Sequence, residues 1–408
     1  MPRTRRLPLD HNLENLKKQA KTLLDGYRSG ESDARSDFEV HHPNLPTPED
    51  AKLTDAQLAR VYRFPSWPKL QLCSRLCSAV NADDREAVRT LVLDHPELLT
   101  EEVRGRRSHW GAAMGLAANL GRTEIVEMLA DMGSQEIQHA FVRAVLQGKI
   151  ETARALVGKG AKVERGILMA PCENLNSDGI QFILDMGAEI CDKKGNPAAP
   201  VAMLLETYSR APGRKHECLK ILADNGVIYP ETPAMAFHLG RIDLLEAHLQ
   251  LDPDLTSRRF DYDEIYPLEF RVWGDDTGLH GTPLQGATLL HIAIDFDERE
   301  IFDWLLEKGA DPNAVATVAE DGFGGHTPLH NCVVKQGKKT DEMIRALLER
   351  GGDPNIRASI RKGLKSTEDE TVHEYRDVSP IEYAEKFHNK NWVNEPAVEA
   401  IRESLSGS

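Results

Sequence analysis

Hydrophobic residues recur at helical spacing in short segments that come in pairs, each pair joined by a polar turn. The clearest pair is "TLLHIAIDFDEREIFDWLLEKGADPNA" at residues 288–314, and "TPLHNCVVKQGKKTDEMIRALLERGGDPNI" at residues 327–356 repeats its order. In the second helix of the later pair, Ile344, Leu347 and Leu348 share one face. The pattern predicts successive helix pairs whose apolar faces must pack on neighbouring pairs.

The stretch "GGHTPLHNCV" at residues 324–333 raises the question of a metal site, because His326 and His330 stand four apart. Thr327 is placed to cap the helix and a proline to occupy its first turn, so the two histidines are not on one regular helix. His330 is placed to bond the Thr327 region and to brace the neighbouring loop, and His291 repeats this role. We therefore expect structural histidines and no metal here, whereas His326 has no such role.

These two segments resemble the ankyrin repeat, whose T-P-L-H-x-A and G-A-D-x-N motifs they match closely. Weaker copies of the helix pair lie at 78–99, 111–133, 139–163, 166–190, 200–227, 232–255 and 379–405. The resemblance implies an all-α fold, an ankyrin-repeat α-solenoid of about nine helix pairs over residues 78–405. It also implies protein–protein binding, because ankyrin arrays mostly bind proteins.

Residues 1–77 do not follow the repeat and are expected to form a helical cap, since a solenoid exposes an apolar face at its end. Ser66 in "FPSWPKL" is placed to cap a helix that begins at Trp67, and another helix is expected to start at Thr54. The segment resembles the start of a group of bacterial ankyrin proteins, which suggests a bacterial origin. An earlier helix is indicated by apolar residues at helical spacing: Leu13, Leu16, Ala20, Leu23, Leu24 and Tyr27.

Three connections in the C-terminal half are longer than the short loop of a regular repeat: 252–285, 314–326 and 356–378. Stacking places equivalent loops on one edge, so we expect the three long loops to lie side by side. The second loop carries three glycines around Phe323, and "EFRVW" in the first loop is expected to be extended. The first loop is rich in aromatic residues: Phe260, Tyr262, Tyr266, Phe270 and Trp273.

We expect the three long loops to form one binding site with aromatic walls and a charged tip. Carboxylates beside imidazoles, including Asp276, Asp321 and His373, could ligate a metal or perform acid/base chemistry. Their spacing matches no metal or catalytic motif. His326 and Arg376 are expected to be exposed. The predicted binding residues are Trp273, Asp275, His280, Phe323, His326, Tyr375 and Arg376.

Composition narrows the function classes. A formal net charge of −15 without a large basic block disfavours nucleic-acid binding. No apolar run approaches ~18 residues, so no membrane span is expected. Six scattered cysteines predict buried, reduced thiols and a cytoplasmic location. No cofactor is predicted. The sequence thus predicts a module that binds a protein partner through a concave face and the long loops. The alternative is a small-molecule or carbohydrate-binding protein or an enzyme, with an acid/base or metal-assisted site beneath those loops.

Overall fold

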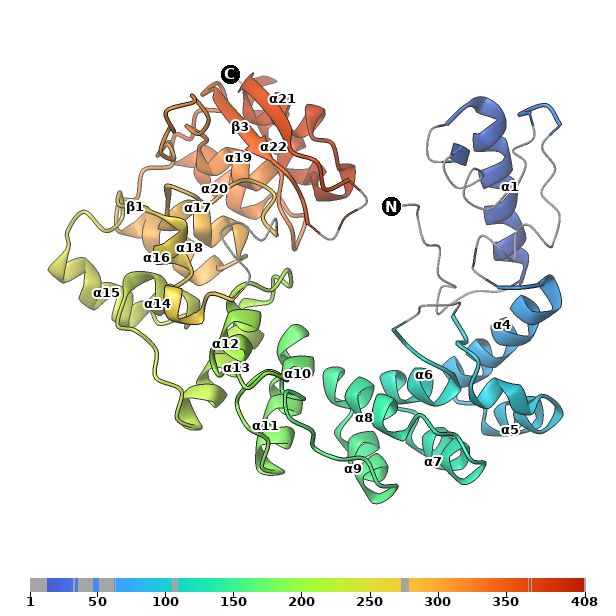
Figure 1. Ribbon diagram of the computed structural model, residues 1–408. Coiled ribbons are helices and arrows are strands. Elements are labelled where there is room, and N and C mark those ends of the chain that lie inside the picture. The colour runs from blue at the N-terminus through green and yellow to red at the C-terminus, as the bar shows by residue number, and fades with distance from the viewer. Residues whose placement is uncertain are drawn as a thin grey trace. The chain divides into compact units, whose positions relative to one another are not determined.

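The computed structural model is mostly helical (Figure 1). It describes residues 13–31, 34–35, 47–50, 62, 64–104, 109–272, 279–365, 367 and 369–406. The chain divides into two compact units. The N-terminal unit comprises Met1–Pro171 and Asp185–Ala188, and the C-terminal unit comprises Cys172–Leu184 and Glu189–Ser408.

Helices of the N-terminal unit follow one another in pairs that stack on their neighbours. They are α1 (Leu13–Ser29), α4 (Trp67–Asn81), α5 (Arg85–Asp94), α6 (Ala113–Leu120), α7 (Thr123–Asp131), α8 (Ile137–Leu146) and α9 (Ile150–Gly158), with a 3₁₀ turn η1 (Pro96–Leu99) after α5. Helix α4 packs on α5 and α6, α6 packs on α7 and α8, and α8 packs on α9. Each helix therefore buries its apolar face against its own partner and the next pair.

The start of α4 is as the sequence predicts. Ser66 is its N-cap, and the Ser66 side chain accepts a hydrogen bond from the Lys69 amide. The boundary expected at residue 77 falls inside α4, which packs on both α5 and α6. The first helix pair thus begins at Trp67, within the segment that was expected to be the cap.

Helix α1 has the expected buried stripe. Leu16, Leu23 and Tyr27 are buried, and Leu24 packs against them. The side chains of Leu13 and Ala20, and the helix expected to start at Thr54, lie outside the described residues.

The C-terminal unit continues the same alternation. After α10 (Met169–Glu173) and α11 (Ser177–Asp185) come α12 (Ala198–Leu205), α13 (Pro212–Asp224), α14 (Pro233–His238), α15 (Ile242–Leu251), α17 (Leu289–Asp295), α18 (Arg299–Glu307), α19 (Pro328–Val333), α20 (Glu342–Glu349), α21 (Pro380–Lys386) and α22 (Glu395–Ser406). We call α12, α14, α17, α19 and α21 the first helices, and α13, α15, α18, α20 and α22 the second helices. First helices stack on one another, since α19 packs on both α17 and α21.

The predicted caps form at both clear repeats. Thr288 and Thr327 are the N-caps of α17 and α19, each in a capping box with a histidine three residues later, His291 or His330. The second helix of the later pair ends at a left-handed residue, Gly351, with a φ of 85°. Local side-chain chemistry therefore sets where these helices begin and end.

The long loops contain short strands and turns, a departure from a purely helical fold. Strand β1 (Arg259–Phe260) pairs with β2 (Ala287–Thr288), and β3 (Ala358–Lys362) pairs with β4 (His373–Val378), both antiparallel. Between β1 and β2 lie helix α16 (Tyr262–Ile265) and the 3₁₀ turn η2 (Leu268–Phe270). The expectation of an extended "EFRVW" is therefore wrong for Glu269 and Phe270, which lie in η2.

Main-chain hydrogen bonds join the three long loops side by side. The Thr317 amide donates to the Gly286 carbonyl at 2.9 Å, next to the first loop. The Gly324 amide donates to the Ser359 carbonyl at 2.7 Å, and the Ser359 amide donates back at 3.2 Å. These bonds fix the second loop between its two neighbours.

Two expectations from composition can be compared with the described residues. Among them, no helix is long and apolar enough to cross a membrane. All six cysteines are buried and free, as predicted.

Candidate functional site

The second and third long loops meet at Phe323, whose ring contacts two arginine side chains. The guanidinium carbon of Arg361 lies 3.9 Å from the centre of the Phe323 ring, and that of Arg376 lies 4.4 Å away. Arg361 also pairs with Asp321 at 2.7 Å, and Glu374 pairs with Arg361 at 3.1 Å and with Arg376 at 2.8 Å. We call residues 318–325 and 358–378 the loop edge.

The backbone holds this cluster in place. Gly324 adopts a φ of 125°, where its neighbours leave no room for a side chain, and its bonds to Ser359 tie the second loop to β3. On the second strand of the hairpin, where Val378 pairs with Ala358, the His330 ring donates from Nε2 to the Val378 carbonyl at 3.2 Å. The predicted brace by His330 is therefore confirmed, and the arginines stand on an ordered hairpin.

His326 is buried, so the expectation that it would be exposed is wrong. Its side chain is 2% exposed and its ring lies 5.7 Å from that of His291, edge to face. Neither ring nitrogen makes a hydrogen bond of good geometry, although the Pro283 carbonyl is near the ring. Burial lowers the pKa of His326 to about 4, against a smaller opposing effect of the Pro283 carbonyl, so the ring is neutral at pH 7. The sequence places His326 in a loop and does not reveal this burial, because neighbouring segments of the chain pack around that loop.

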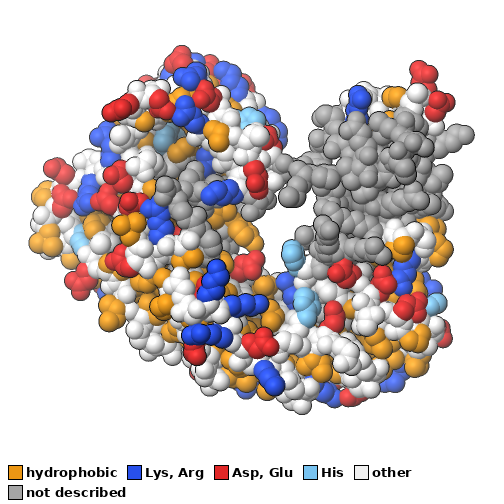
Figure 2. All heavy atoms as spheres, viewed as in Figure 1, with side chains coloured by type: hydrophobic (Ala, Val, Ile, Leu, Met, Phe, Trp, Pro, Cys, Tyr) orange, Lys and Arg blue, Asp and Glu red, His pale blue; other side chains and the backbone are white. Residues whose placement is uncertain are grey.

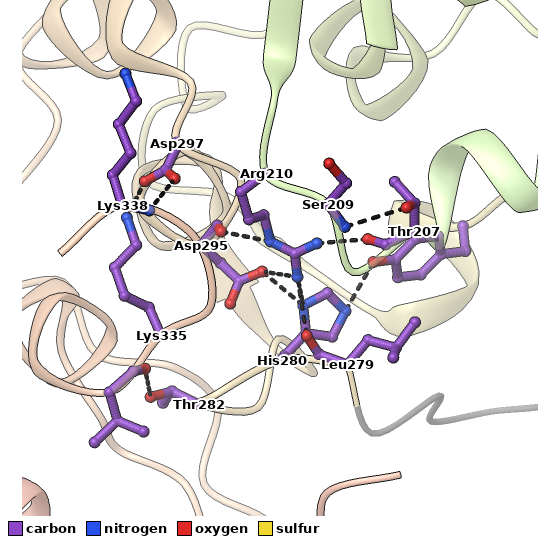
Figure 3. Close-up of polar contacts among 12 residues, drawn as sticks. Thr207, Ser209, Arg210, Leu279, His280, Thr282, Asp295, Asp297, Lys335 and Lys338 are labelled. Carbon is purple, nitrogen blue, oxygen red and sulfur yellow. Dashed lines mark hydrogen bonds and ion pairs between the residues drawn. The ribbon is translucent and has the colours of Figure 1, made fainter. Parts of the chain in front are cut away.

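His280 is also buried, in a polar chain that Figure 3 shows. Its Nδ1 lies 2.7 Å from an Asp295 carboxylate oxygen, and its Nε2 lies 2.8 Å from the Tyr266 hydroxyl. The Arg210 guanidinium binds the same Asp295 oxygen at 2.9 Å. Burial would raise the pKa of Asp295, but Arg210 and His280 hold it below its usual value. An ionised Asp295 only accepts, so Nδ1 carries the imidazole proton and Nε2 accepts from the tyrosine.

Of the remaining predicted residues, one is buried, one is exposed and the others lie outside the described residues. Tyr375 is 5% exposed, and its hydroxyl lies 2.6 Å from Nδ1 of His388. Arg376 is exposed, as expected, with 61% of its side chain accessible. Trp273, Asp275 and Asp276 lie outside the described residues. The structure thus brings Phe323 and Arg376 into contact and places Tyr375 on the same hairpin, while His280 and His326 bond or pack elsewhere.

Segment 279–285 of the first loop bonds to residues in or next to α17, α19 and α21. The Leu279 carbonyl accepts from Arg210 at 3.0 Å, and the Thr282 hydroxyl donates to the Val334 carbonyl at 3.2 Å (Figure 3). Further along, the Tyr383 hydroxyl donates to the Gly281 carbonyl at 3.0 Å. This segment therefore covers part of the face that α17, α19 and α21 form together.

The chain Tyr266–His280–Asp295 has the order of groups that moves a proton in many enzymes. However, Tyr266, His280 and Asp295 are at most 2% exposed, so the chain is closed to solvent in this arrangement. Arg210 joins these groups to the connection between α12 and α13, where it also donates to the Thr207 carbonyl at 2.5 Å. In this arrangement these hydrogen bonds hold segment 279–285 against the helices. Within the described residues, no group of three His, Cys, Asp or Glu side chains is arranged to hold a metal.

A pocket of about 450 Å³ lies at the starts of the second helices. Its walls include the first turn of α13 at residues 211–214, Arg299 at the start of α18, and Glu342 at the start of α20. Lys335 and Asp297 form a buried ion pair in its wall. We call this the helix-start pocket. Of the predicted binding residues that the structure describes, none lines this pocket.

Comparison with known families agrees with the local geometry of the clear repeats. A family model described as ankyrin repeats (3 copies) matches residues 273–358. Residues 273–358 are ankyrin repeats. No curated protein matches the chain. The resemblance on which the sequence analysis relied is thus confirmed, and the ankyrin segment contains Phe323, His326 and His330.

Sequence reasoning missed the polar residues that connect the ankyrin segment to α12 and α13. Arg210 and Asp295 are 85 positions apart, and no motif relates them. One available signal was connection length. In the clear pair 288–314 the turn between the helices is only residues 296–298, whereas the connections that hold Arg210 and Lys335 are longer. Extra residues between the two helices of a pair therefore indicate a candidate site, as the long loops between pairs do.

Proposed function

We propose that this ankyrin-repeat protein is a binding module that holds a protein partner at the loop edge. The observation that carries the proposal is the pair of exposed arginines, Arg361 and Arg376, stacked on Phe323. Their side chains are 40% and 61% exposed. Arginine is enriched among residues that dominate binding energy, and ordering before binding lowers the entropy cost of holding a long side chain. Ankyrin repeats generally act as protein–protein interaction modules, which supports a protein partner.

Two further observations favour the loop edge over the face that α17, α19 and α21 form together, which segment 279–285 partly covers. Segment 279–285 already bonds to residues in or next to α17, α19 and α21. On the loop edge, by contrast, Val318 and Val372 are 57% and 63% exposed. Exposed apolar side chains beside arginines suit a partner that presents acidic and apolar groups. We assign His280, His326 and Tyr375 to the support of this surface.

We further propose that the helix pairs flanking residues 273–358 continue the same array, about nine pairs in all, with the segment before α4 as its cap. The alternation of first and second helices from α4 to α22 supports this array. We place the protein in the bacterial cytoplasm, in keeping with its six buried, free cysteines. In Figure 2 basic and acidic side chains are interspersed on the visible face of the C-terminal unit, which gives nucleic acid no continuous basic surface there.

The test uses the purified full chain as bait in a lysate of its own cells. Proteins retained by the parent are compared with those retained by Arg361→Glu/Arg376→Glu. The matched control is Arg345→Glu/Arg402→Glu, since these arginines are 46% and 47% exposed on α20 and α22. We expect one or more partners to be lost only with the first double variant. With the purified partner, calorimetry should show at least about tenfold weaker binding for that variant. Equal binding by both double variants would exclude the loop edge.

A small-molecule or carbohydrate site beneath the loops, either a binding site or a catalytic one, is the second candidate. It is favoured by the Tyr266–His280–Asp295 chain, and it requires segment 279–285 to move away, because these groups are closed to solvent. Tyr266→Phe keeps the ring and removes the hydroxyl. A sugar or metabolite that binds the parent and not Tyr266→Phe, in a screen followed by melting temperature, would support this candidate.

A further inference from the structure

The helix-start pocket has the size of a site for a small metabolite. Its volume of about 450 Å³ lies within the usual range for ligand pockets. Second helices α13, α18 and α20 all begin at its wall, and Asn394, the residue before α22, completes it. The repeated stacking of pairs therefore gathers several helix N-termini around one cavity.

The pocket is positive, although the chain as a whole is acidic. Five basic and two acidic side chains line it, in a protein of formal net charge −15. Some of this charge is already matched, since Arg210 pairs with Asp295 and Lys335 with Asp297. No hydrogen bond or ion pair joins the Lys338 ammonium to another described residue, whereas the Lys338 amide donates to Asp297 at 3.0 Å. Lys338 is thus held through its backbone amide, and its ammonium group is not paired with any described residue.

The start of α13 adds main-chain donors to this charge. Its N-cap, Ala211, provides no side-chain cap, and its first turn contains no acidic residue. The amides of Gly213 and Arg214 at this start therefore keep their donors, next to the positive end of the helix dipole. A helix start of this kind favours a bound anion. The pocket surface at Gly213 is open, because a Cβ there would meet no atom within 4 Å.

Asn394 supplies an acceptor in the same wall. Its side chain is 2% exposed, and Nδ2 donates to the Cys332 carbonyl at 3.0 Å and to the Thr340 carbonyl at 2.8 Å. These two bonds fix the orientation of the amide, and Oδ1 is left buried without a partner. A buried acceptor without a donor is costly, so a ligand hydroxyl or amine at this position would be favoured.

We propose that the helix-start pocket binds a small organic phosphate that also carries hydroxyl groups. The phosphate contacts Lys338 and the amides at the start of α13, and a hydroxyl donates to Oδ1 of Asn394. Arg299, which is partly engaged by Asp303 at 2.8 Å and Glu342 at 3.4 Å, borders the same space and adds positive charge. This site is separate from the loop edge and does not depend on the function proposed for it.

The test is calorimetric titration of the full chain with glycerol 3-phosphate, inorganic phosphate and glycerol. We expect glycerol 3-phosphate to bind more tightly than inorganic phosphate, because only the former offers hydroxyl donors, and glycerol to show no binding. Added salt should weaken both phosphates. Absence of any phosphate binding up to about 10 mM, a very weak affinity, would overturn the proposal, as would equal binding of glycerol and glycerol 3-phosphate.

Variants then locate the site. Gly213→Asp places a carboxylate in the open part of the pocket, where it favours the helix start and opposes a bound anion. We expect it to keep the melting temperature and to weaken glycerol 3-phosphate at least about tenfold, with Gly213→Ala unchanged. Lys338→Ala should lose about tenfold, while Lys220→Ala, a 74% exposed lysine on α13, should bind as the parent does. Parent-like binding by both Gly213→Asp and Lys338→Ala would show that phosphate binds elsewhere and refute this pocket.

Discussion

Nε2 of His330 donates to the carbonyl oxygen of Val378 at 3.2 Å, across 48 positions of sequence. The same bond runs from His291 to the carbonyl of His326 at 3.1 Å, across 35 positions. In both cases the acceptor is the residue just before the next helix cap, Ser379 or Thr327. The histidine therefore fixes where the following insertion ends, whatever its length. This explains how a long hairpin can follow the ankyrin segment while the first helices on either side of it, α19 and α21, stay stacked.

His330→Ala should lower the free energy of unfolding by about 2 kcal/mol. The variant loses the bond to Val378 and the acceptor for the Thr327 amide, each worth on the order of 1 kcal/mol. His291→Ala should behave alike. Urea denaturation measures both, with His95→Ala as the control, because His95 has a side chain 45% exposed. A loss no larger than that of His95→Ala would show that the brace contributes nothing.

His326→Leu should stabilise the protein by about 1 kcal/mol at pH 7, although it lies four positions from His330. Both ring nitrogens of His326 are buried without a partner, and an apolar side chain of similar size removes that cost. The measurement is again urea denaturation. Destabilisation comparable with that of His330→Ala would mean that the ring makes a bond important to the fold.

Comparison of His326 with His330 shows which contacts the sequence predicts and which it does not. Thr327, Pro328 and His330 interact within one helical turn, so the motif itself predicts their bonds and the outcome agrees. The burial of His326 depends on Pro283 and His291, which reach it through the stacking of loops and have no local signal. The same limit explains why Arg210 was not predicted, since its partners come from two distant segments.

Stability should fall as the pH decreases from about 6.5 toward 4. Burial lowers the pKa of His326 to about 4 and that of His330 to about 3, whereas both titrate near 6.5 in the unfolded chain. Between these values the unfolded chain binds protons that the folded chain does not, so acid favours unfolding, and above pH 7 these groups contribute no slope. Each contributes up to about 1.4 kcal/mol per pH unit. Urea midpoints measured across this range should show a shallower slope for His326→Leu, and an unchanged slope would contradict the assignment.

Arg210→Met should cost about 3–5 kcal/mol, because it leaves the Asp295 carboxylate buried beside His280 without its main cation. Both side chains of this pair are at most 1% exposed. The matched control is Arg402→Met, which breaks a pair with Glu385 whose side chains are 47% and 55% exposed, and it should change stability by less than about 0.5 kcal/mol. Chemical denaturation of both variants separates a buried pair from a surface pair, and similar losses would argue that Arg210 is solvated in solution.

Gly324→Ala should loosen the loop edge more than its small change in volume implies. Gly324 has a φ of 125°, which side-chain-bearing residues rarely adopt, and an added Cβ would overlap the Thr317 carbonyl oxygen. Relief requires the second loop to move, which breaks the paired bonds between Gly324 and Ser359. Gly309→Ala is the control, because Gly309 also has a positive φ of 84° but no atom lies within 4 Å of its Cβ position. The control should cost about 1 kcal/mol, the conformational strain alone, and Gly324→Ala at least about 2 kcal/mol more. Hydrogen exchange should then be faster at the Ser359 amide in Gly324→Ala and unchanged there in Gly309→Ala. Equal losses in the two variants, with Ser359 still protected, would mean that the close approach of Gly324 to Thr317 does not hold the loop edge together.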